Sequence, residues 1–341
     1  MKISVVVPTI RENSIRRFIG EWEEVFDKYK INLIIIEDNP IKSFEINKNL
    51  KFPIFHYSWE DIEKDLGKDS WIIPRRTSAI KSYGFWKAYQ MKSDMIIALD
   101  DDCYPLENYI KNFNRNNFIK SHYDALFKNS YQEIKWVSTI RLKGNIRPRG
   151  LPYKQVEDII DSNKIILNHG LWANIPDFDA ITQLKFKKFP KIENYFIQQI
   201  IPVGKYFPMC GMNLAWKREL TPAMYFMLMG KDKNEKSWGV DRFDDIWAGI
   251  FVKKICDHLG YRITSGYPVI WHDRASDPYK NLEKERSGMK INEYLWKEVD
   301  RVKLTKDNLK DCYRELVIKL KIKGDYFKKL KKSVNIWIEL F

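Results

Sequence analysis

The sequence is poor in cysteine and contains no long apolar run. Its few cysteines are far apart and form no Cys-x-x-Cys pair, which argues against a zinc knuckle and a disulfide framework; they are Cys103, Cys210, Cys256 and Cys312. No stretch reaches the roughly 20 apolar residues that span a bilayer, and the amino-terminal residues lack the cleavage region of a signal peptide. We therefore expect a cytoplasmic protein.

Acidic residues are outnumbered by basic ones, 45 against 59, which gives a net charge of +14. A basic protein attracts polyanions such as nucleic acids, anionic membranes and phosphorylated substrates. The chain has neither an RNA-binding signature nor a repeat of basic and aromatic residues. Nucleic acid is therefore a minor alternative, and we expect no nucleic-acid partner.

The chain begins with two short apolar runs and a helical stretch between them. Residues 3–7 and 33–36 are typical of buried strands, and residues 14–29 carry apolar side chains at helical spacing. Such a β-α-β unit predicts an α/β fold with parallel strands. The side chains that follow these strands are candidates to bind a base or ribose, although loop capping would explain the last of them nearly as well: Thr9, Arg11 and Asp38.

Three consecutive carboxylates, Asp100, Asp101 and Asp102, follow a third apolar run at residues 95–99. Ligands of open α/β sheets collect at the carboxyl ends of the strands, which is where this acidic triplet falls. Mg²⁺ and Mn²⁺ prefer carboxylate ligands, and proteins commonly share them with the phosphates of a substrate. The triplet therefore predicts a metal–diphosphate site, and a solvated acidic turn is the alternative.

Basic residues stand near the start of a helix that we predict over residues 74–90. Arg75, Arg76 and Lys81 oppose the helix dipole at that end. A bound diphosphate would explain their position, because phosphates bind at helix amino termini and to basic side chains. Surface solvation is a fair alternative for Arg75.

Residues 136–183 are dense in glycine, proline, arginine and aromatic residues and have no clear period. This composition is typical of loops that form a pocket. Trp172 is a candidate to stack on a sugar ring. His169 is a candidate contact as well, although a lone histidine in such a place is more often a hydrogen-bonded structural residue. Arg147 and Arg149 flank a proline in the same segment.

A second acidic motif begins a predicted helix at Asp244 and Asp245. The helix dipole favours carboxylates in a first turn, so capping would explain them, but with Asp241 there are three acids within five residues, more than capping requires. His272 follows a predicted strand at residues 263–270 and could reach the same rim. There it would complete a metal-binding set with the oxygens of the triplet.

Several motifs, in order along the chain, resemble the reversibly glycosylated polypeptides, also called UDP-arabinopyranose mutases. They are VVPTIR at 6–11, DDDC at 100–103, HGLWANIPDFDA at 169–180, FPMCGMNLAW at 207–216, PAMYFMLMG at 222–230, RFDDIWAG at 242–249, CDHLGY at 256–261 and IWHDRASDP at 270–278. The resemblance runs collinearly from about residue 3 to about residue 285 and continues weakly to about 320. It implies a fold similar to the GT-A glycosyltransferases, an α/β fold whose mixed, mostly parallel sheet is flanked by helices.

The resemblance also implies an activity, the interconversion of the pyranose and furanose forms of a UDP-pentose such as UDP-L-arabinose. The substrate would be a UDP-sugar, and the cofactor would be Mn²⁺ or Mg²⁺ without flavin. Asp100 and Asp102 would bind the metal, with His272 as a third ligand by analogy to the broader fold. Asp101 would support this site or contact the ribose.

Members of the family carry a sugar reversibly on an arginine downstream of an Arg-Gly-Tyr-Pro-Phe segment, which residues 149–153 match in part. Here no arginine occurs from residue 150 to residue 217. Either Arg147 or Arg149 substitutes, or the intermediate forms without arginine, or the chain is a glycosyltransferase with a separate acceptor. Asp244 and Asp245 would lie near the sugar in each case.

The end of the chain is basic and reads as helices. We predict a catalytic domain over residues 1–290 and a helical extension over residues 291–341. Residues 319–341 interleave lysines with apolar side chains, a pattern typical of a helix that lies on a membrane surface. Docking onto the protein's own domain or onto a partner subunit is a commoner use of such a helix. Because the family often assembles, we also expect a homo-oligomer.

Overall fold

The structure of the chain is a computed structural model that describes residues 1–46, 49–110, 117–135, 149–152, 157–185, 198–273 and 277–341. Its α-helices are α1 (Glu12–Tyr29), α2 (Trp59–Leu66), α3 (Lys81–Gln90), α4 (Phe118–Phe127), α5 (Ala180–Lys185), α6 (Asp244–His258), α7 (Pro278–Asp300), α8 (Leu309–Lys319) and α9 (Asp325–Glu339). Short 3₁₀ helices are η1 (Gly67–Ile72), η2 (Ser78–Ile80), η3 (Leu106–Asn108), η4 (Ser162–Lys164) and η5 (Arg218–Ala223).

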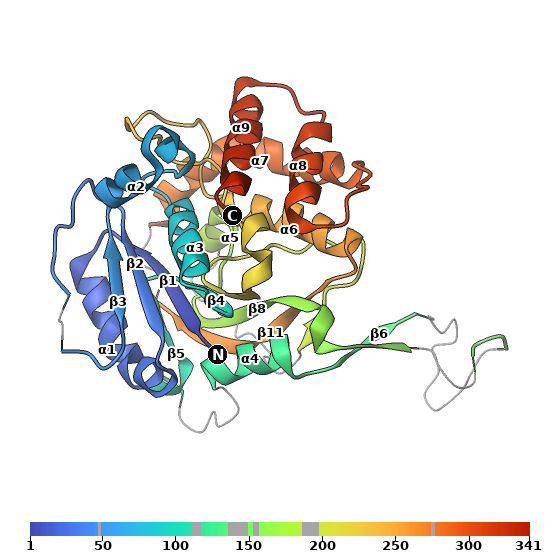
Figure 1. Cartoon of the computed structure of the whole chain (residues 1–341), viewed down its shortest axis with the longest axis horizontal. Helices are drawn as coiled ribbons and strands as arrows, with labels where there is room; N and C mark the ends of the chain where they lie inside the picture. The colour runs from blue at the N-terminus through green and yellow to red at the C-terminus, as the bar shows by residue number, and fades with distance from the viewer. Residues whose placement is uncertain (47–48, 111–116, 136–148, 153–156, 186–197, 274–276) are drawn as a thin grey trace.

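One large sheet organises the molecule (Figure 1). Its strands are β1 (Ile3–Thr9), β2 (Asn32–Glu37), β3 (Ile54–Tyr57), β4 (Met95–Leu99), β5 (Cys103–Pro105), β8 (Ile165–Asn174), β9 (Gln199–Ile200), β10 (Asn213–Lys217) and β11 (Arg262–His272). They follow the order β3-β2-β1-β4-β10-β8-β11-β5, and β9 pairs with β11. Within the described part of the chain, β10, β5 and β9 oppose the direction of the other six strands. The predicted mixed, mostly parallel sheet is confirmed.

The parallel strands all end at one edge of the sheet. The residues predicted to bind ligands stand at or just after these strand ends. Thr9 at the end of β1 lies beside Glu37 at the end of β2. Asn174 at the end of β8 lies beside His272 at the end of β11. The acidic triplet follows β4, which is the other parallel neighbour of β1. Because the side chains at this edge come from five strands, residues far apart in the sequence meet there.

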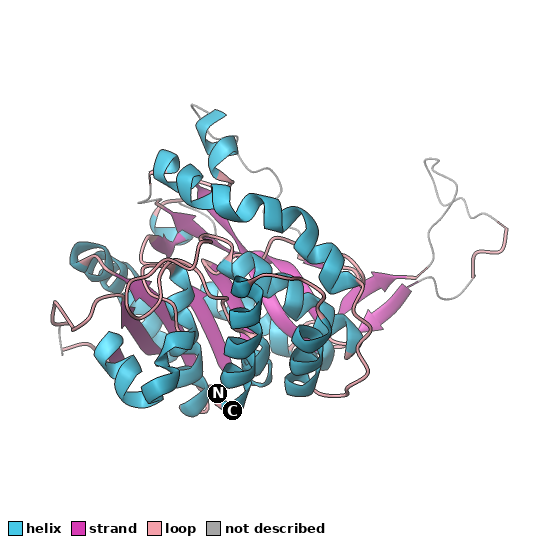
Figure 2. Ribbon diagram, turned by 90° about the horizontal axis from the view of Figure 1, so that it is seen from above, coloured by secondary structure: helices cyan, strands magenta, loops and turns pink. Residues whose placement is uncertain are grey.

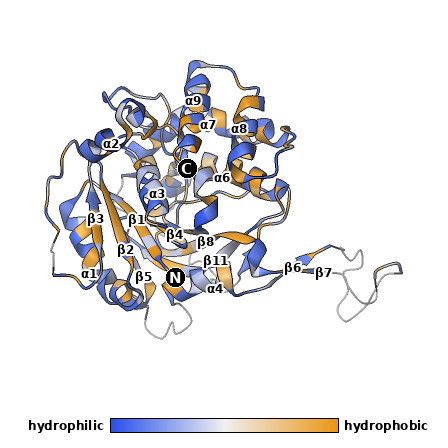
Figure 3. Ribbon diagram, in the orientation of Figure 1, coloured by the Kyte–Doolittle hydropathy of each residue, from blue (hydrophilic) through white to orange (hydrophobic). Residues whose placement is uncertain are grey.

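Helices cover both faces of the sheet (Figure 2). Alternate residues of β1 point to opposite faces, so Val6 packs with α2, α3 and α6, whereas Val5 and Val7 pack with α1 and α4. On α1 the apolar residues recur at helical spacing and are buried against the sheet, which confirms the predicted first helix. Figure 3 shows the same division, with apolar strands in the middle and mixed colours on the surrounding helices.

The helix predicted over residues 74–90 begins later than expected. Its first α-helical residue is Lys81, because a backbone bridge takes up residues nearer the predicted start. The backbone of Arg75 pairs in both directions with that of Lys231, at 2.8 and 2.9 Å. Arg76 then has a φ of 60°, a left-handed conformation that ends this short bridge.

The last two helices dock onto the protein's own core. Apolar residues of α9 are buried against η1, η5 and α8, and the indole Nε1 of Trp337 donates to the carbonyl oxygen of Pro222 at 3.0 Å. The Tyr326 hydroxyl donates to the carbonyl oxygen of Leu228 at 2.9 Å. The apolar face of α9 is therefore covered by the protein's own domain, which is the commoner of the two uses considered for this helix. Across the described ranges, no helix is long and apolar enough to cross a membrane.

The predicted boundary between residues 290 and 291 falls inside α7. Leu295 and Val299, beyond that point on α7, belong to the same buried cluster as Trp247 and Phe251 of α6. The carboxy-terminal helices and the sheet therefore share one hydrophobic core.

A two-stranded ribbon of β6 (Tyr131–Ile134) and β7 (Glu157–Ile160) extends away from the body (Figure 1). Its base is attached by an ion pair in which Arg262 Nε lies 2.8 Å from Glu133 Oε1. Hydrogen bonds to a guanidinium hold the pKa of Glu133 at about 2. The described residues 149–152 lie at the outer end of this arm.

Candidate active site

Two adjoining cavities open at the edge where the parallel strands end. The first, of about 410 Å³, lies over β1, β2 and β4, and we call it the strand cavity. The second, of about 500 Å³, lies against the start of α6, and we call it the α6 cavity. The two share the lining residues Thr77, Ser78, Asp100 and Lys284. They therefore form one continuous site with two compartments.

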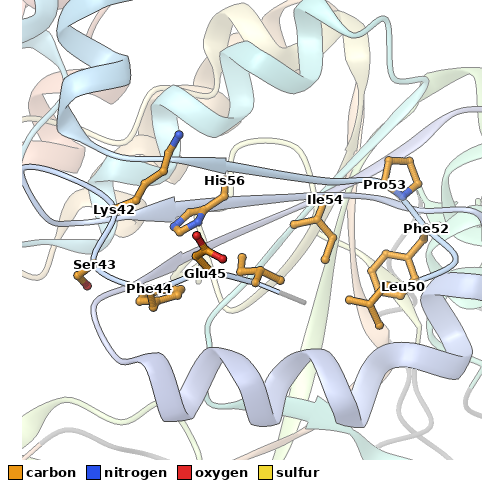
Figure 4. A pocket seen from close by; sticks show the side chains of 10 residues that line it. Lys42, Ser43, Phe44, Glu45, Leu50, Phe52, Pro53, Ile54 and His56 are labelled. Carbon is orange, nitrogen blue, oxygen red and sulfur yellow. The ribbon is translucent and has the colours of Figure 1, made fainter. Parts of the chain in front are cut away.

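A third hollow, of about 830 Å³, is larger but lies elsewhere (Figure 4). It is bounded by β3 and the preceding loop, and apolar side chains such as Phe44, Leu50 and Phe52 line much of it. His56 lines it as well, but its Nε2 is bonded to Glu37 Oε2 at 2.9 Å. None of the residues of the two acidic motifs lines this hollow, so we place the active site in the other two cavities.

In the strand cavity, Asp101 is held from both sides. The hydroxyl of Thr9 donates to its carboxylate at 2.6 Å, and the guanidinium of Arg11 forms an ion pair with it. Burial raises the pKa of Asp101, while Arg11 opposes that shift. Thr9, Arg11 and Asp101 therefore meet as a hydrogen-bonded group on the wall of this cavity.

Asp100 pairs with a lysine that is completely enclosed. The side chain of Lys81 is 1% exposed; its ammonium contacts the Asp100 carboxylate and donates to the carbonyl oxygen of Gly211 at 2.9 Å. Burial alone would lower the pKa of Lys81, but the neighbouring Asp100 raises it above its ordinary value. Lys81 thus lies beneath the triplet instead of facing the cavity, where we expected it to bind a diphosphate.

Asp102 and His272 approach each other at the strand ends. His272 Nε2 lies 3.8 Å from Asp102 Oδ1, and His272 Nδ1 lies 2.7 Å from the carbonyl oxygen of Ile175. A ring whose Nδ1–H is bound to a carbonyl presents its Nε2 lone pair, which is the usual arrangement of a metal-binding histidine. Considering only the residues that the structure describes, no three His, Cys, Asp or Glu side chains converge closely enough to hold a metal. The two groups nevertheless form a mixed oxygen and nitrogen donor pair that suits a divalent ion.

Asp38 and Arg76 line the strand cavity as predicted. The Asp38 carboxylate accepts hydrogen bonds from Trp59 Nε1 at 2.7 Å and from the backbone N–H of Thr77 at 3.1 Å. Its burial raises its pKa to about 6. The Arg76 guanidinium donates to the Asp38 carbonyl oxygen at 3.0 Å and forms an ion pair with Glu235 at 3.1 Å.

Asp244 and Asp245 occupy the first turn of α6 and line the α6 cavity. The Ser78 hydroxyl donates to Asp244 at 2.7 Å, and the backbone N–H of Gly211 donates to Asp245 at 2.8 Å. Burial raises the pKa of both carboxyl groups, and for Asp245 the neighbouring Asp244 raises it further. Because burial and the neighbouring carboxylate disfavour the charged form, the pair holds a proton more readily than free aspartates do, which suits it to general acid catalysis.

A family model described as reversibly glycosylated polypeptide matches residues 1–341. The chain belongs to this family. It is 35% identical over 359 residues to a protein of Pisum sativum named probable UDP-arabinopyranose mutase 1, and the alignment covers 99% of this chain and 90% of that protein. It is 34% identical to UDP-arabinopyranose mutase 1 of Arabidopsis thaliana, with 99% and 91% covered. Among solved structures it is similar to S. aureus TarS 1-349, with 12% identity, a TM-score of 0.33, and 100% and 89% covered.

The two predicted sugar contacts on β8 differ in whether they line a cavity. Trp172 lines the α6 cavity. His169 does not line either cavity; it is buried inside the sheet, where its Nδ1 lies 3.1 Å from Ser265 Oγ and its ring packs against Trp172 and Phe207. Burial lowers its pKa to about 4, so the ring is neutral. His169 thus lies within β8, which pairs with strands on both sides, and apart from both cavities.

Arg149, one of the two predicted arginines, lines neither cavity. Arg149 is exposed and belongs to residues 149–152 at the outer end of the arm, far from the sheet edge (Figure 1). Arg147 lies outside the described residues. Among the described residues, the arginine that lines the α6 cavity is Arg242, the first residue of the motif at 242–249, and its Nε lies 3.1 Å from Glu285 Oε1.

Proposed function

We propose that the chain is a metal-dependent UDP-sugar mutase that interconverts pyranose and furanose forms, with a UDP-L-arabinose type of substrate and no flavin. The observation that carries the proposal is the continuous site of two compartments, in which the triplet at the strand ends adjoins a buried acidic pair. The family membership supports it, because relatives covered over 90% or more of their length are named UDP-arabinopyranose mutases.

The strand cavity suits the nucleotide. Buried acceptors such as the Asp38 carboxylate can bind the N–H of a uracil or the hydroxyls of a ribose, and Arg76 lies beside it. Thr9 and Arg11 line the same cavity and are joined through Asp101. The diphosphate would then lie between the two compartments, next to Asp100.

Mn²⁺ or Mg²⁺ fits this position because carboxylate and imidazole groups converge there. Asp102 and His272 would hold the ion together with oxygens of the diphosphate, and Asp100 lies next to them. When bound, the ion neutralises charge that develops on the departing UDP.

The α6 cavity suits the sugar. The bond from the anomeric carbon to UDP breaks with its electron pair on the diphosphate, and the neighbouring carboxylates stabilise the positive charge left on the sugar. Another hydroxyl of the sugar then bonds to the anomeric carbon and loses its proton, the former ring oxygen leaves that carbon and gains a proton, and UDP re-forms its bond to the anomeric carbon of the new ring. Asp244 and Asp245, whose pKa values are raised by burial, can serve both transfers.

The position of Arg149 favours a second candidate, a glycosyltransferase with a separate acceptor. Because the segment 149–152 lies at the end of the arm, no arginine of that segment reaches the α6 cavity to carry a sugar. A sugar activated in this cavity could then pass to a glycan or lipid-linked acceptor.

The test is incubation of the purified protein with Mn²⁺ and UDP-arabinopyranose, UDP-galactopyranose or UDP-xylose, without acceptor, followed by anion-exchange chromatography. A UDP-furanose peak that disappears in Asp102→Asn would support the mutase. Asp325→Asn is a matched control, because this aspartate is 94% exposed on α9, away from the site. Slow release of UDP without a new sugar nucleotide would favour the transferase, and no reaction at all would count against both.

A further inference from the structure

The junction of the two cavities requires a cation that can move toward a diphosphate. The other cations that line the strand cavity or lie beneath it are already engaged. Lys81 is enclosed beneath Asp100, Arg11 is bound to Asp101, and Arg76 is held by the Asp38 carbonyl and Glu235. Lys284 remains, and it is the only basic residue that lines both cavities among the described residues.

Lys284 stands on a firmly fixed part of α7. The next residue, Glu285, is buried; one carboxylate oxygen accepts from Arg242 Nε at 3.1 Å and the other from the backbone N–H of Ala180 at 2.9 Å. The side chain of Lys284 itself is 50% exposed, and its Nζ lies 3.3 Å from Asp241 Oδ2. The backbone is thus held in place while the ammonium stays free to move.

We propose that Lys284 is the diphosphate-binding cation of this site, and that it exchanges Asp241 for the terminal phosphate of UDP when the nucleotide binds. The lysine of this ion pair is half exposed and keeps much of its hydration, and the less exposed Asp241 carboxylate retains a hydrogen bond from the backbone N–H of Arg242 at 2.9 Å, so leaving Asp241 costs little. A phosphate offers more charge and more acceptor oxygens than one carboxylate, so the exchange is favourable. The inference rests on the proposed function. It means that α7 forms the wall of the site next to the departing UDP.

The interaction should depend on the number of phosphates. In the proposed binding mode the base and ribose lie beside Asp38 at the end of β2, whereas the terminal phosphate of UDP reaches the junction lined by Lys284. The contribution of Lys284 is therefore expected to be greatest for UDP, smaller for UMP and nil for uridine.

The test measures the affinity of Lys284→Met for UDP, UMP and uridine by titration calorimetry in the presence of Mg²⁺. We expect UDP to bind about tenfold more weakly, which corresponds to about 1.4 kcal/mol, with no change for uridine. Lys284→Arg should retain most of the affinity. Lys280→Met is the matched control, because this lysine is exposed one turn earlier on α7 and lines neither cavity. Asp241→Asn should bind UDP as tightly as the parent or more tightly, since it releases the ammonium.

The outcomes separate the inference from the proposed function. If the parent protein does not bind UDP, the proposed function is wrong. If the parent binds UDP and Lys284→Met binds it equally well, only the role of Lys284 is wrong. An equal loss for UDP and uridine would also overturn that role, because it would mean that the cavity as a whole has changed shape.

Discussion

Replacing Lys81 with methionine should destabilise the protein through a buried charge. The ammonium is enclosed, and its removal leaves the Asp100 carboxylate and the Gly211 carbonyl oxygen without their partner. Breaking a buried ion pair by removing one partner costs about 3–5 kcal/mol. Because the Asp100 side chain is 26% exposed and keeps part of its hydration, we expect a smaller loss, about 2–3 kcal/mol.

Thermal unfolding measures this loss directly. At about 2 °C per kcal/mol for a chain of this size, Tm should fall by about 4–6 °C. Lys87→Met is a matched control on the same helix. Its side chain is 18% exposed and pairs with Asp65 near the surface, so its loss should stay below about 1 kcal/mol.

The double variant Lys81→Met/Asp100→Asn decides whether charge is the cause. It removes the orphaned carboxylate, so it should recover part of the stability that the single variant loses. The reasoning fails if Lys81→Met unfolds within 1 °C of the parent. It also fails if the double variant is less stable than the sum of its single variants, because the two groups would then not be coupled as a pair.

Two further predictions concern the nucleotide wall and the last helix. Because burial raises the pKa of Asp38 from 3.8 to about 6, the folded protein holds this proton more tightly than the unfolded chain, and this carboxyl group lowers stability as pH rises from about 4 to about 6. Asp38→Asn should therefore gain roughly 2–3 kcal/mol relative to the parent between pH 4 and pH 7 in urea unfolding, and a constant difference would contradict the shift. Trp337→Ala should cost about 3–5 kcal/mol, since the indole is fully buried and bonded to Pro222, whereas the partly buried Ile336→Ala should cost clearly less in the same assay.

The local sequence pattern correctly predicted those elements whose apolar residues are the ones buried in the structure. The first two strands followed from continuous apolar runs and the helix between them from its helical spacing, and the place of the acidic triplet followed from the rule that parallel strands end at one edge. The same rule brought His272 beside Asp102, although 170 positions separate them in the chain. These predictions needed only the direction of the strands.

Contacts between distant segments escaped prediction. The helix predicted from residue 74 starts at Lys81, because a backbone bridge to Lys231 takes up the residues before it. His169 could not be distinguished from a ligand until the length of β8 was known. Lys284 has no motif around it, and only the packing of α7 against the start of α6 brings it to the site.

Burial divides the cations of the site into fixed and exchangeable ones. A lysine that loses all of its hydration needs a permanent partner, so Lys81 can shape the triplet but cannot leave it to meet a substrate. A half-exposed lysine keeps its hydration and can change partners at little cost, as proposed for Lys284. The two methionine variants should therefore have opposite signatures. Lys81→Met should lower Tm, whereas Lys284→Met should leave Tm within about 1 °C and weaken UDP binding. If Lys284→Met lowered Tm as much as Lys81→Met does, exposure would not be what distinguishes the two roles.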